Sequence, residues 1–420
     1  MKPERREIEV WADWDGLAAT RVGVLSATPT RGKEVFAFTY ETAWLAHQDR
    51  PSLDPVLALY RGPQYPSDTR DNFGAFLDSA PDRWGRVLMR RWEAQRAREE
   101  GRKPRTLLES DYLLGVFDGH RSGGLRYRLG PDGPFLDDDA ELASPPWTSL
   151  RKLEQISRAL EQDGVEDDPS YGRWLKMLLA PGRSLGGARP KASVRAPTGE
   201  LWIAKFPSRD DPHDIGAWEW VTHALATRAG IVTAPSRCQR FRARGHHTFL
   251  TQRFDRQGEQ RRHFASAMTL LEKQDGEPGS YLELAEAIAQ RGLHPARDLE
   301  QLWRRICFFV CVSNLDDHLR NHGFLLEGAR GWSLAPAYDM NPDPLGAGLT
   351  LDISESDNAQ DLDLVRSVAP HFRVKPERVD TVIAEVVTAV RTWRELATSL
   401  GLSRAEHDRM GRAFRVADDA

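Results

Sequence analysis

A polar segment around residue 320 carries the side chains that are best suited to chemistry in this chain. Asp316 and Asn321 are five positions apart, and Asp339 follows a short stretch later. In the catalytic loop of a protein kinase, the same separation lies between the aspartate that orients the attacking hydroxyl and an asparagine that binds magnesium, and a further aspartate also binds the metal. The three residues therefore predict phosphoryl transfer, which depends mostly on positioning the reactants and neutralising their charge.

The element that would position this loop is an apolar helix directly before it. Asp and Asn are common in loops, so their spacing alone is weak evidence. The preceding string LEQLWRRICFFVCVSNL, however, predicts a buried helix that ends near Asn314. Cys307 and Cys311 are four positions apart in this helix, and we expect both to be small core residues. The helix would deliver the polar loop from a rigid element.

A lysine upstream could bind the phosphates of a nucleotide. Residues 182–191 read GRSLGGARPK, a glycine-rich turn, and two strand-like runs follow, KASVRA and ELWIAKF. Lys205 lies near the end of the second run, and kinases bind the α- and β-phosphates with such a strand lysine. The turn is not a Walker A loop, because Ala188 occupies the position of the required lysine. The next helix, predicted over residues 215–231, carries Glu219, which we expect to orient Lys205.

In combination, these strings resemble the HipA family of bacterial toxin kinases, the toxin halves of type II toxin–antitoxin pairs. The resemblance rests on five strings that occur in family order, SLGGARPKASV, LWIAKFP, QRFDR, NLDDHLRNH and LAPAYDM. It covers most of the 420 residues, because the N-terminal region also looks like the small leading domain of the family.

The resemblance implies an α+β fold. The expected architecture is a bilobal protein-kinase-like fold with an additional N-terminal α/β subdomain and a mainly helical C-terminal lobe. We accordingly expect an N-terminal subdomain over residues 1–147, a region like a kinase N-lobe over 148–255, and a helical C-lobe over 256–420.

The resemblance also implies roles for individual residues. Asp316 is the implied catalytic base, and Asn321 and Asp339 are the implied ligands of magnesium. Ser184 matches a serine that the family phosphorylates in its own loop, which ejects the loop and silences the kinase. The residues implied to contact ATP are Lys205 together with Gly186, Gly187, Ala188, Arg189, Pro190, Lys191, Gln252, Arg253, Phe254, His318 and Tyr338.

The implied activity is transfer of the γ-phosphate of ATP, with Mg²⁺, to a serine or threonine of a protein. By resemblance the target would be a translation component such as an aminoacyl-tRNA synthetase. A helix-turn-helix antitoxin of the HipB kind would neutralise the kinase, and DNA would be contacted only indirectly, through the antitoxin complex. Two alternatives stay open: a small-molecule phosphotransferase of the antibiotic kind, and an inactive kinase-fold scaffold that serves as a co-repressor.

The composition is consistent with this activity. A chain of 420 residues exceeds one compact core and favours two or more domains. A net charge of −4 argues against a protein whose whole surface binds nucleic acid. No run of 18 apolar residues occurs, the start MKPERREIEV lacks the apolar stretch of a signal peptide, and three cysteines cannot all pair. We therefore expect a cytoplasmic protein with no membrane partner.

Three further patterns allow two interpretations each. The eight arginines of residues 83–105 could bind phosphate or an acidic partner, but we favour a solvated helix face with counter-charges such as Glu93. The string GHRSGG could cradle phosphate, but a hairpin turn between two predicted strands, DYLLGVF and GLRYRL, explains it better. His318 and His322 could form a zinc site with Asp316, which the kinase context disfavours.

The remaining patterns in the sequence predict secondary structure and a buried core. Residues 7–40 predict strands and hairpins, with apolar and polar residues alternating in EVFAFTY. Residues 73–98 predict helix. Near the C-terminus, apolar residues between 379 and 390 recur at helical spacing and predict a helix with one buried face.

Overall fold

The chain folds into two compact units, and both helices and strands contribute to it. The computed structural model describes residues 4–14, 17–47, 50–67, 70–136, 145–179, 189–327 and 331–420. Unit 1 comprises Met1–Arg209, Asp255–Ala265 and Leu326–Arg330, and unit 2 comprises Asp210–Phe254, Ser266–Leu325 and Gly331–Ala420. The division into residues 1–147, 148–255 and 256–420 stays a prediction.

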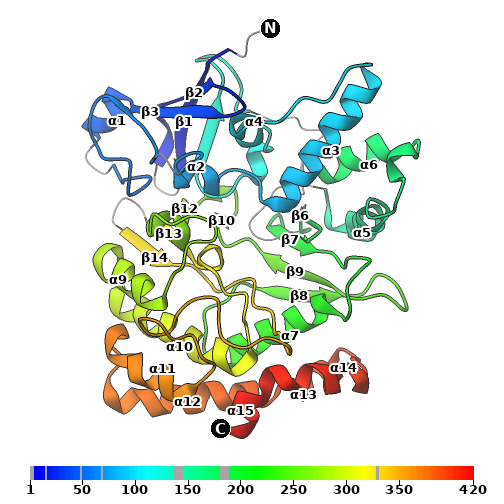
Figure 1. Ribbon diagram of the computed structural model, residues 1–420, viewed down its shortest axis with the longest axis vertical. Coiled ribbons are helices and arrows are strands. Elements are labelled where there is room, and N and C mark those ends of the chain that lie inside the picture. Colours follow the sequence, from blue (N-terminus) through cyan, green and yellow to red (C-terminus); the bar gives the residue numbers. More distant parts are fainter. Residues whose placement is uncertain are drawn as a thin grey trace. The chain divides into compact units, whose positions relative to one another are not determined.

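The main sheet of unit 1 has five antiparallel strands in the order β4-β3-β2-β1-β5. They are β1 (Arg6–Trp14), β2 (Leu17–Pro29), β3 (Glu34–Tyr40), β4 (Pro63–Gln64) and β5 (Leu125–Arg128), coloured blue to cyan in Figure 1. Along β3, Phe36, Phe38 and Tyr40 are buried and alternate with more exposed residues. This alternation is typical of a sheet with one face on the core. The strands predicted within residues 7–40 are confirmed.

The strand predicted for the string DYLLGVF is wrong, because its first residues belong to helix α4 (Glu109–Leu114). Asp111 lies in the first turn, and its carboxylate accepts a hydrogen bond from the amide of Leu108 at 2.9 Å. The same carboxylate forms ion pairs with Arg6 at 2.8 Å and Arg105 at 2.7 Å. These contacts stabilise the helix start, and the apolar pattern of the string does not show them. The second predicted strand, GLRYRL, is confirmed as β5.

The string GHRSGG forms a buried structural turn in unit 1. Arg121 is fully buried and donates hydrogen bonds to the carbonyl oxygens of Ser79, Leu113 and Val116 at 3.0, 2.9 and 3.1 Å. A buried guanidinium needs such acceptors, because an unsatisfied charge inside a protein is costly. These contacts support the structural interpretation over a phosphate loop, although a helix and not a strand precedes the turn.

The longest helix of unit 1 is α3 (Arg83–Glu99), which begins at Arg83 after its N-cap Asp82. The other helices of this unit include α1 (Thr42–Ala46), α2 (Gly74–Asp78), α4, α5 (Leu150–Ala159) and α6 (Tyr171–Leu179), and α3 packs along α6 (Figure 1). The Asp82 carboxylate caps α3 by accepting a hydrogen bond from the amide of Gly85 at 2.8 Å. The helix predicted over residues 73–98 is therefore interrupted, because Pro81 and Asp82 separate α2 from α3.

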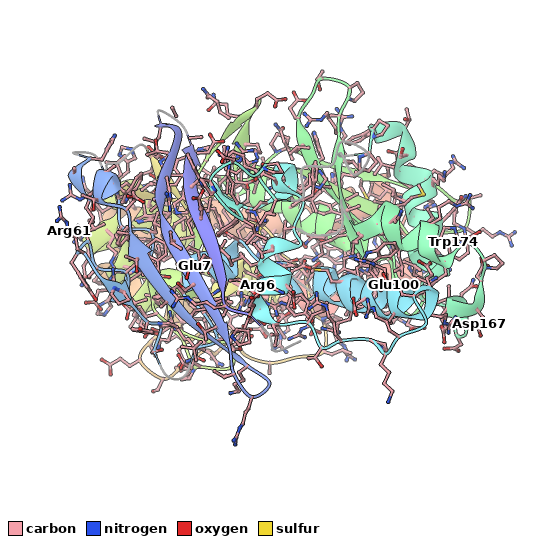
Figure 2. All side chains as sticks on the ribbon, turned by 90° about the horizontal axis from the view of Figure 1, so that it is seen from above. Arg6, Glu7, Arg61, Glu100, Asp167 and Trp174 are labelled. Carbon is pink, nitrogen blue, oxygen red and sulfur yellow. The ribbon has the colours of Figure 1, made fainter. Side chains whose placement is uncertain are left out.

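The arginine-rich segment of α3 and the residues after it form ion pairs within unit 1. Arg102 lies 2.5 Å from a Glu93 oxygen and 2.6 Å from a Glu100 oxygen. Arg98 lies 3.1 Å from Asp167, and Figure 2 shows Glu100 and Asp167 at the same end of this unit. These contacts support the interpretation as a charged helix face with acidic counter-charges.

Two antiparallel strands of unit 1 carry the lysines of the nucleotide prediction. They are β6 (Lys191–Arg195) and β7 (Leu201–Lys205), joined by a turn in which Gly199 has a φ of +100°. A positive φ strains residues that have a Cβ atom, so the turn requires glycine at this position. The strands predicted for KASVRA and ELWIAKF are confirmed. Unit 1 also contains the short strands β10 (Arg256–Gln257) and β11 (Gln260–Arg261).

Helix α10 (Pro295–Val312) forms the core of unit 2. It starts with proline at its first position, where the missing N–H leaves no helical hydrogen bond unformed. Every residue from 302 to 312 is buried. Cys307 and Cys311 are fully buried, and burial raises the pKa of the Cys311 thiol to about 12. The prediction of a buried helix with two core cysteines is confirmed.

Other helices pack around α10 in unit 2, among them α11, α12 and α15 (Figure 1). They are α7 (Ile215–Arg228), α8 (Ala267–Leu270), α9 (Tyr281–Arg291), α11 (Leu362–Val368), α12 (Pro376–Val390), α13 (Trp393–Ser399), α14 (Arg404–Met410) and α15 (Arg415–Asp419). The strands of this unit are β8 (Ser236–Gln239), β9 (Thr248–Gln252) and β14 (Gly331–Leu334), while β12 (Phe264–Ser266) and β13 (Gly323–Glu327) cross the unit boundary in sequence. The helices predicted before residue 231 and around residues 379–390 are confirmed as α7 and α12. No helix among the described residues combines the length and apolarity needed to cross a membrane.

A buried ion pair connects β6 to the start of α3. Lys191 Nζ lies 2.8 Å from Asp82 Oδ2, and the two side chains are 1% and 7% exposed. Breaking a buried pair by removing one partner typically costs about 3–5 kcal/mol, because the remaining charge has lost its counter-charge in a poorly solvated site.

We predict that Asp82→Ala lowers the free energy of unfolding by about 3–5 kcal/mol, measured by urea unfolding with tryptophan fluorescence. Asp82→Asn keeps an oxygen that can cap α3, so it separates the loss of the ion pair from the loss of the cap. As a matched control, Asp167→Ala removes the exposed partner of Arg98 and should cost about 0–1 kcal/mol. If Asp82→Ala lowered the free energy of unfolding no more than Asp167→Ala does, the buried pair of Asp82 and Lys191 would not stabilise the fold as proposed.

Candidate active site

The end of α10 places the string NLDDHLRNH, residues 314–322, which we call the polar loop. Ser313 ends the helix with a left-handed backbone (φ +50°), and its hydroxyl donates a hydrogen bond to the carbonyl oxygen of Ala413 at 2.8 Å. The buried Asn314 accepts a hydrogen bond through Oδ1 from the amide of Asn341 at 2.9 Å. The start of the polar loop is therefore fastened to the C-terminal helical region and to the segment that follows the string LAPAYDM.

Within the polar loop, a hydrogen bond holds the two central residues of the motif together. Asn321 Nδ2 donates to the carbonyl oxygen of Asp316 at 3.0 Å, and the Asn321 amide donates to the carbonyl oxygen of His318 at 2.8 Å. Asp316 itself is exposed, as a base that must reach a substrate proton has to be. Asn321 is only 5% exposed. One residue thus faces solvent while the other is fixed inside the loop.

The side-chain oxygen of Asn321 has the properties of a metal ligand. Asn321 Oδ1 is buried and has no hydrogen-bond partner among the described residues. Buried polar atoms usually have a hydrogen-bond partner, so this oxygen is available to a ligand such as a cation. Magnesium prefers oxygen ligands and is usually held by one or two protein carboxylates together with substrate phosphates and water.

The zinc alternative can be compared with the side chains that the structure describes. The described part of the chain contains no group of three or more His, Cys, Asp or Glu side chains placed to hold a metal ion. His322, which the zinc alternative requires, is 1% exposed, and its Nε2 lies 2.7 Å from Asp317 Oδ2. A zinc ion bound through His322 Nε2 would have to replace this contact with Asp317, whereas magnesium needs fewer protein ligands.

Asp339 lies in a turn that contacts the polar loop. Its backbone is left-handed (φ +56°), a conformation that Asp and Asn tolerate better than most residues. Its Oδ1 accepts a hydrogen bond from Asn341 Nδ2 at 3.3 Å. The preceding residue, Tyr338, donates its hydroxyl to the carbonyl oxygen of Arg320 at 2.6 Å. The hydrogen bond of Tyr338 thus connects the segment that carries Asp339 to the polar loop that carries Asn321.

Two of the residues implied to contact the nucleotide are also neighbours in unit 2. The rings of Phe254 and Tyr338 lie 5.5 Å apart between centroids and are tilted by 36°. Gln252, at the end of β9, is partly exposed, whereas Arg253 is only 2% exposed. Because the Arg253 side chain is buried, a nucleotide contact at this position would be made by the backbone. His318 Nδ1 is buried, and no hydrogen bond to it occurs among the described atoms.

The other implied nucleotide contacts belong to unit 1. Lys191 and Lys205 are paired across β6 and β7, so their side chains share one face of the sheet at this strand pair. The Lys191 ammonium is held by Asp82, whereas Lys205 is only partly buried. Arg189 and Pro190 precede β6, and the carbonyl oxygen of Pro190 accepts a hydrogen bond from the amide of Phe206 at 2.9 Å. Ser184, Gly186, Gly187 and Ala188 lie outside the described residues.

The lysine–glutamate pair of the prediction is divided between the two units. Lys205 belongs to unit 1, and Glu219 belongs to unit 2, where it is 3% exposed within α7. Their pairing stays a prediction.

Sequence reasoning missed the residue that contacts Asp317 most closely. The Tyr281 hydroxyl donates to Asp317 Oδ2 at 2.5 Å, and both residues are buried. Burial and the charge of Asp317 raise the pKa of Tyr281 well above its ordinary value, so the phenol stays a donor. Tyr281 lies in α9, 36 residues before Asp317, and no local spacing connects the two.

A family model and two solved structures are similar to this chain. The family described as the HipA-like C-terminal domain matches residues 183–394. The chain is similar to one in the solved complex of HipA, HipB and operator DNA from the toxin–antitoxin system of Shewanella oneidensis MR-1. The TM-score is 0.66 with 16% identity, over 98% of this chain and 97% of that chain, which shows a shared fold.

A second solved structure is less similar. It is the proinflammatory kinase CtkA of Helicobacter pylori, with a TM-score of 0.37 and 13% identity over 55% of this chain and 94% of that chain. This TM-score is too low to support a structural argument. No curated protein matches the chain.

Proposed function

The chain belongs to the HipA-like family, and from this premise we propose that it is an ATP- and Mg²⁺-dependent kinase that phosphorylates a serine or threonine of a protein. The observation that carries the proposal is the pairing of an exposed Asp316 with a buried Asn321 whose Oδ1 has no partner among the described residues. A carboxylate is thereby available to a substrate hydroxyl, and an amide oxygen is available to a cation.

In the proposed reaction, Asp316 accepts the proton of the substrate hydroxyl while that oxygen attacks the γ-phosphorus of ATP. The bond between the γ-phosphorus and the β,γ-bridging oxygen breaks, and ADP leaves. Magnesium, when bound, supplies positive charge that neutralises the phosphates. Asn321 and Asp339 would hold it through their side-chain oxygens. The hydrogen bond from Asn321 to the Asp316 carbonyl keeps the base and the metal ligand at a fixed separation.

We also propose the nucleotide contacts that the family resemblance implies. Lys205 would bind the α- and β-phosphates, with Glu219 as its orienting partner, and residues 186–191 would cover the nucleotide. The backbone of residues 252–254 would read the adenine edge, beside the ring pair of Phe254 and Tyr338. In this proposal, residues 148–255 act as the N-lobe and residues 256–420 as the C-lobe of a bilobal kinase, preceded by the subdomain of residues 1–147.

The proposed biological role is that of a toxin kinase controlled by an antitoxin. Family membership supports this role, and the similar Shewanella chain occurs in a complex of HipA, HipB and operator DNA. We propose a helix-turn-helix partner of the HipB kind, contact with DNA only through that partner, and a location in the cytoplasm. The target would be a translation component such as an aminoacyl-tRNA synthetase.

We predict that Asp316→Ala lowers the rate of phosphate transfer by about 10²–10⁴-fold, as expected for loss of a positioned general base. Binding of Mg·ATP should be retained. Transfer is measured with γ-labelled ATP onto the protein itself and onto proteins of a bacterial extract, and binding by calorimetry. Asp363→Ala removes an exposed carboxylate of the same unit and should leave the rate unchanged. A wild-type rate in Asp316→Ala would exclude this residue as the base.

The same assay separates the alternatives. A small-molecule phosphotransferase would label an aminoglycoside antibiotic and leave proteins unlabelled. An inactive scaffold would label neither. Either result would refute the proposed protein kinase activity.

We predict that Asn321→Ala and Asp339→Asn each weaken the binding of Mg·ATP, because the first removes an oxygen ligand and the second a negative charge. Asp339→Asn keeps a residue that tolerates a left-handed backbone, so the variant should fold. Asn321→Asp keeps an oxygen ligand and should bind better than Asn321→Ala. Calorimetry with Mg²⁺, and with EDTA as the metal-free control, measures the effect. Unchanged Mg·ATP affinity in both variants would remove these residues from the metal site.

We predict that the kinase phosphorylates its own Ser184, a role that rests on the family resemblance. A phosphoserine adds about −1.5 to −2 charges, which would repel the nucleotide phosphates beside it. Mass spectrometry after incubation with Mg·ATP should find phosphate on Ser184 in the wild type and none there in Asp316→Ala. Ser184→Asp should weaken ATP binding, and Ser184→Ala should preserve it. An active kinase without phosphate on Ser184 would leave this residue only a turn-stabilising role.

A further inference from the structure

A buried carboxylate directly follows the proposed catalytic base, and the proposed reaction does not use it. Asp317 is 1% exposed, whereas the adjacent Asp316 is exposed. Asp317 Oδ2 accepts one hydrogen bond from the Tyr281 hydroxyl at 2.5 Å and lies 2.7 Å from His322 Nε2. Because an ionised carboxylate only accepts hydrogen bonds, His322 is the donor. Burying a carboxylate is costly without such partners, so these two donors permit Asp317 to stay inside the protein.

The hydrogen bond between His322 and Asp317 has the same spacing along the chain as the hydrogen bond between Asn321 and Asp316. Asn321 donates to the carbonyl oxygen of Asp316, and His322 donates to the carboxylate of Asp317, so both links join residues five positions apart. The residues of the second link directly follow those of the first in the chain. Fixing Asp317 and His322 therefore limits how far Asp316 and Asn321 can move relative to each other.

Helices of unit 2 hold this second link in place. Tyr281 is the first residue of α9, where Ser280 and Glu283 form a capping box that fixes the helix start. The Tyr281 and His322 rings lie 5.8 Å apart at 88°, an edge-to-face arrangement. Phe309 of α10 lies 6.2 Å from the same His322 ring. The imidazole is thus packed between two helices, and the polar loop is attached to both.

A buried cation, Arg305, extends the arrangement toward the segment that carries Asp339. Burial lowers the pKa of Arg305 to about 10, and the negative charge of Asp317 opposes this lowering. Arg305 therefore stays protonated at neutral pH, and it donates a hydrogen bond to the carbonyl oxygen of Ala335 at 2.6 Å. Ala335 lies four residues before Asp339. The charge of Asp317 thus favours the cation that holds the approach to Asp339.

We propose that Asp317, held by Tyr281 and His322, is a positioning residue that sets the separation between Asp316 and Asn321. The proposal rests on the proposed function, because it assigns Asp317 a part in phosphate transfer. Small displacements of reacting groups lower the rate steeply, since the reaction depends on near-attack geometry. Loss of this arrangement should therefore lower kcat more than it changes the KM for ATP.

The test compares variants that remove single hydrogen bonds. Asp317→Asn should lower kcat by about 10²-fold and change the KM for ATP by less than about threefold. Tyr281→Phe removes one donor and should lower kcat by about tenfold. Added to Asp317→Asn, it should have little further effect, because both changes break the same contact. His322→Leu should lower kcat, and His322→Gln, which places a donor near the position of Nε2, should restore much of it.

A matched control and a second measurement separate positioning from stability. Tyr40→Phe removes a buried hydroxyl donor in unit 1 and should leave kcat unchanged. Hydrogen–deuterium exchange of the ligand-free protein should be faster over residues 314–322 in Asp317→Asn and Tyr281→Phe, and unchanged over α12. Normal kcat in folded Asp317→Asn, or unchanged exchange of the polar loop, would overturn the proposal. If the wild type transfers no phosphate, the proposed function fails, and loop exchange still decides whether Asp317 holds the loop.

Discussion

The burial of α10 is the constraint on which the rest of the candidate site depends. A helix that is buried along its last three turns must end inside the protein, where water cannot satisfy the polar groups that follow it. Ser313, Asn314 and Asp317 each obtain a partner from another part of unit 2. These contacts leave the buried Asn321 Oδ1 without a partner among the described residues, so this oxygen is available to a ligand.

Both units bury charged groups as well as aromatic rings. Unit 1 buries charge, and its guanidinium, ammonium and carboxylate groups are matched with acceptors or counter-charges, as Arg121 and Lys191 show. In unit 2, Trp393 stacks on Phe414 with centroids 4.6 Å apart, and Trp218 lies beside both. Ion pairs of this kind fix geometry at little net gain in stability, whereas aromatic burial contributes stability directly.

The sequence predicted those parts of the structure whose information is local. The apolar run of α10, the alternation in β3 and the turn between β6 and β7 all lie within short windows, and so do Asp316 and Asn321. Helix α4 was missed because Asp111 draws its stability from Arg6, which is distant in the chain. Tyr281 was missed for the same reason.

Backbone conformation was a second kind of information that the sequence did not supply. Aspartate is common in loops, and nothing in the string LAPAYDM distinguishes a left-handed residue from an ordinary one. Likewise, Lys191 and Lys205 look alike in sequence, and only the fold shows that the first is held by Asp82. Residue type therefore identified the candidate site residues, while only the structure showed how the surroundings of one candidate differ from those of another.

The left-handed backbone at Asp339 has a consequence for how such a gene can change. Most substitutions there add backbone strain, but asparagine and glycine tolerate the conformation, and each is a single nucleotide away from the aspartate codons. An allele of either kind would lose the carboxylate and keep the folded surface. Under the proposed function, such a chain would lose activity through a change of one base, and it would still present the surface that a partner protein recognises.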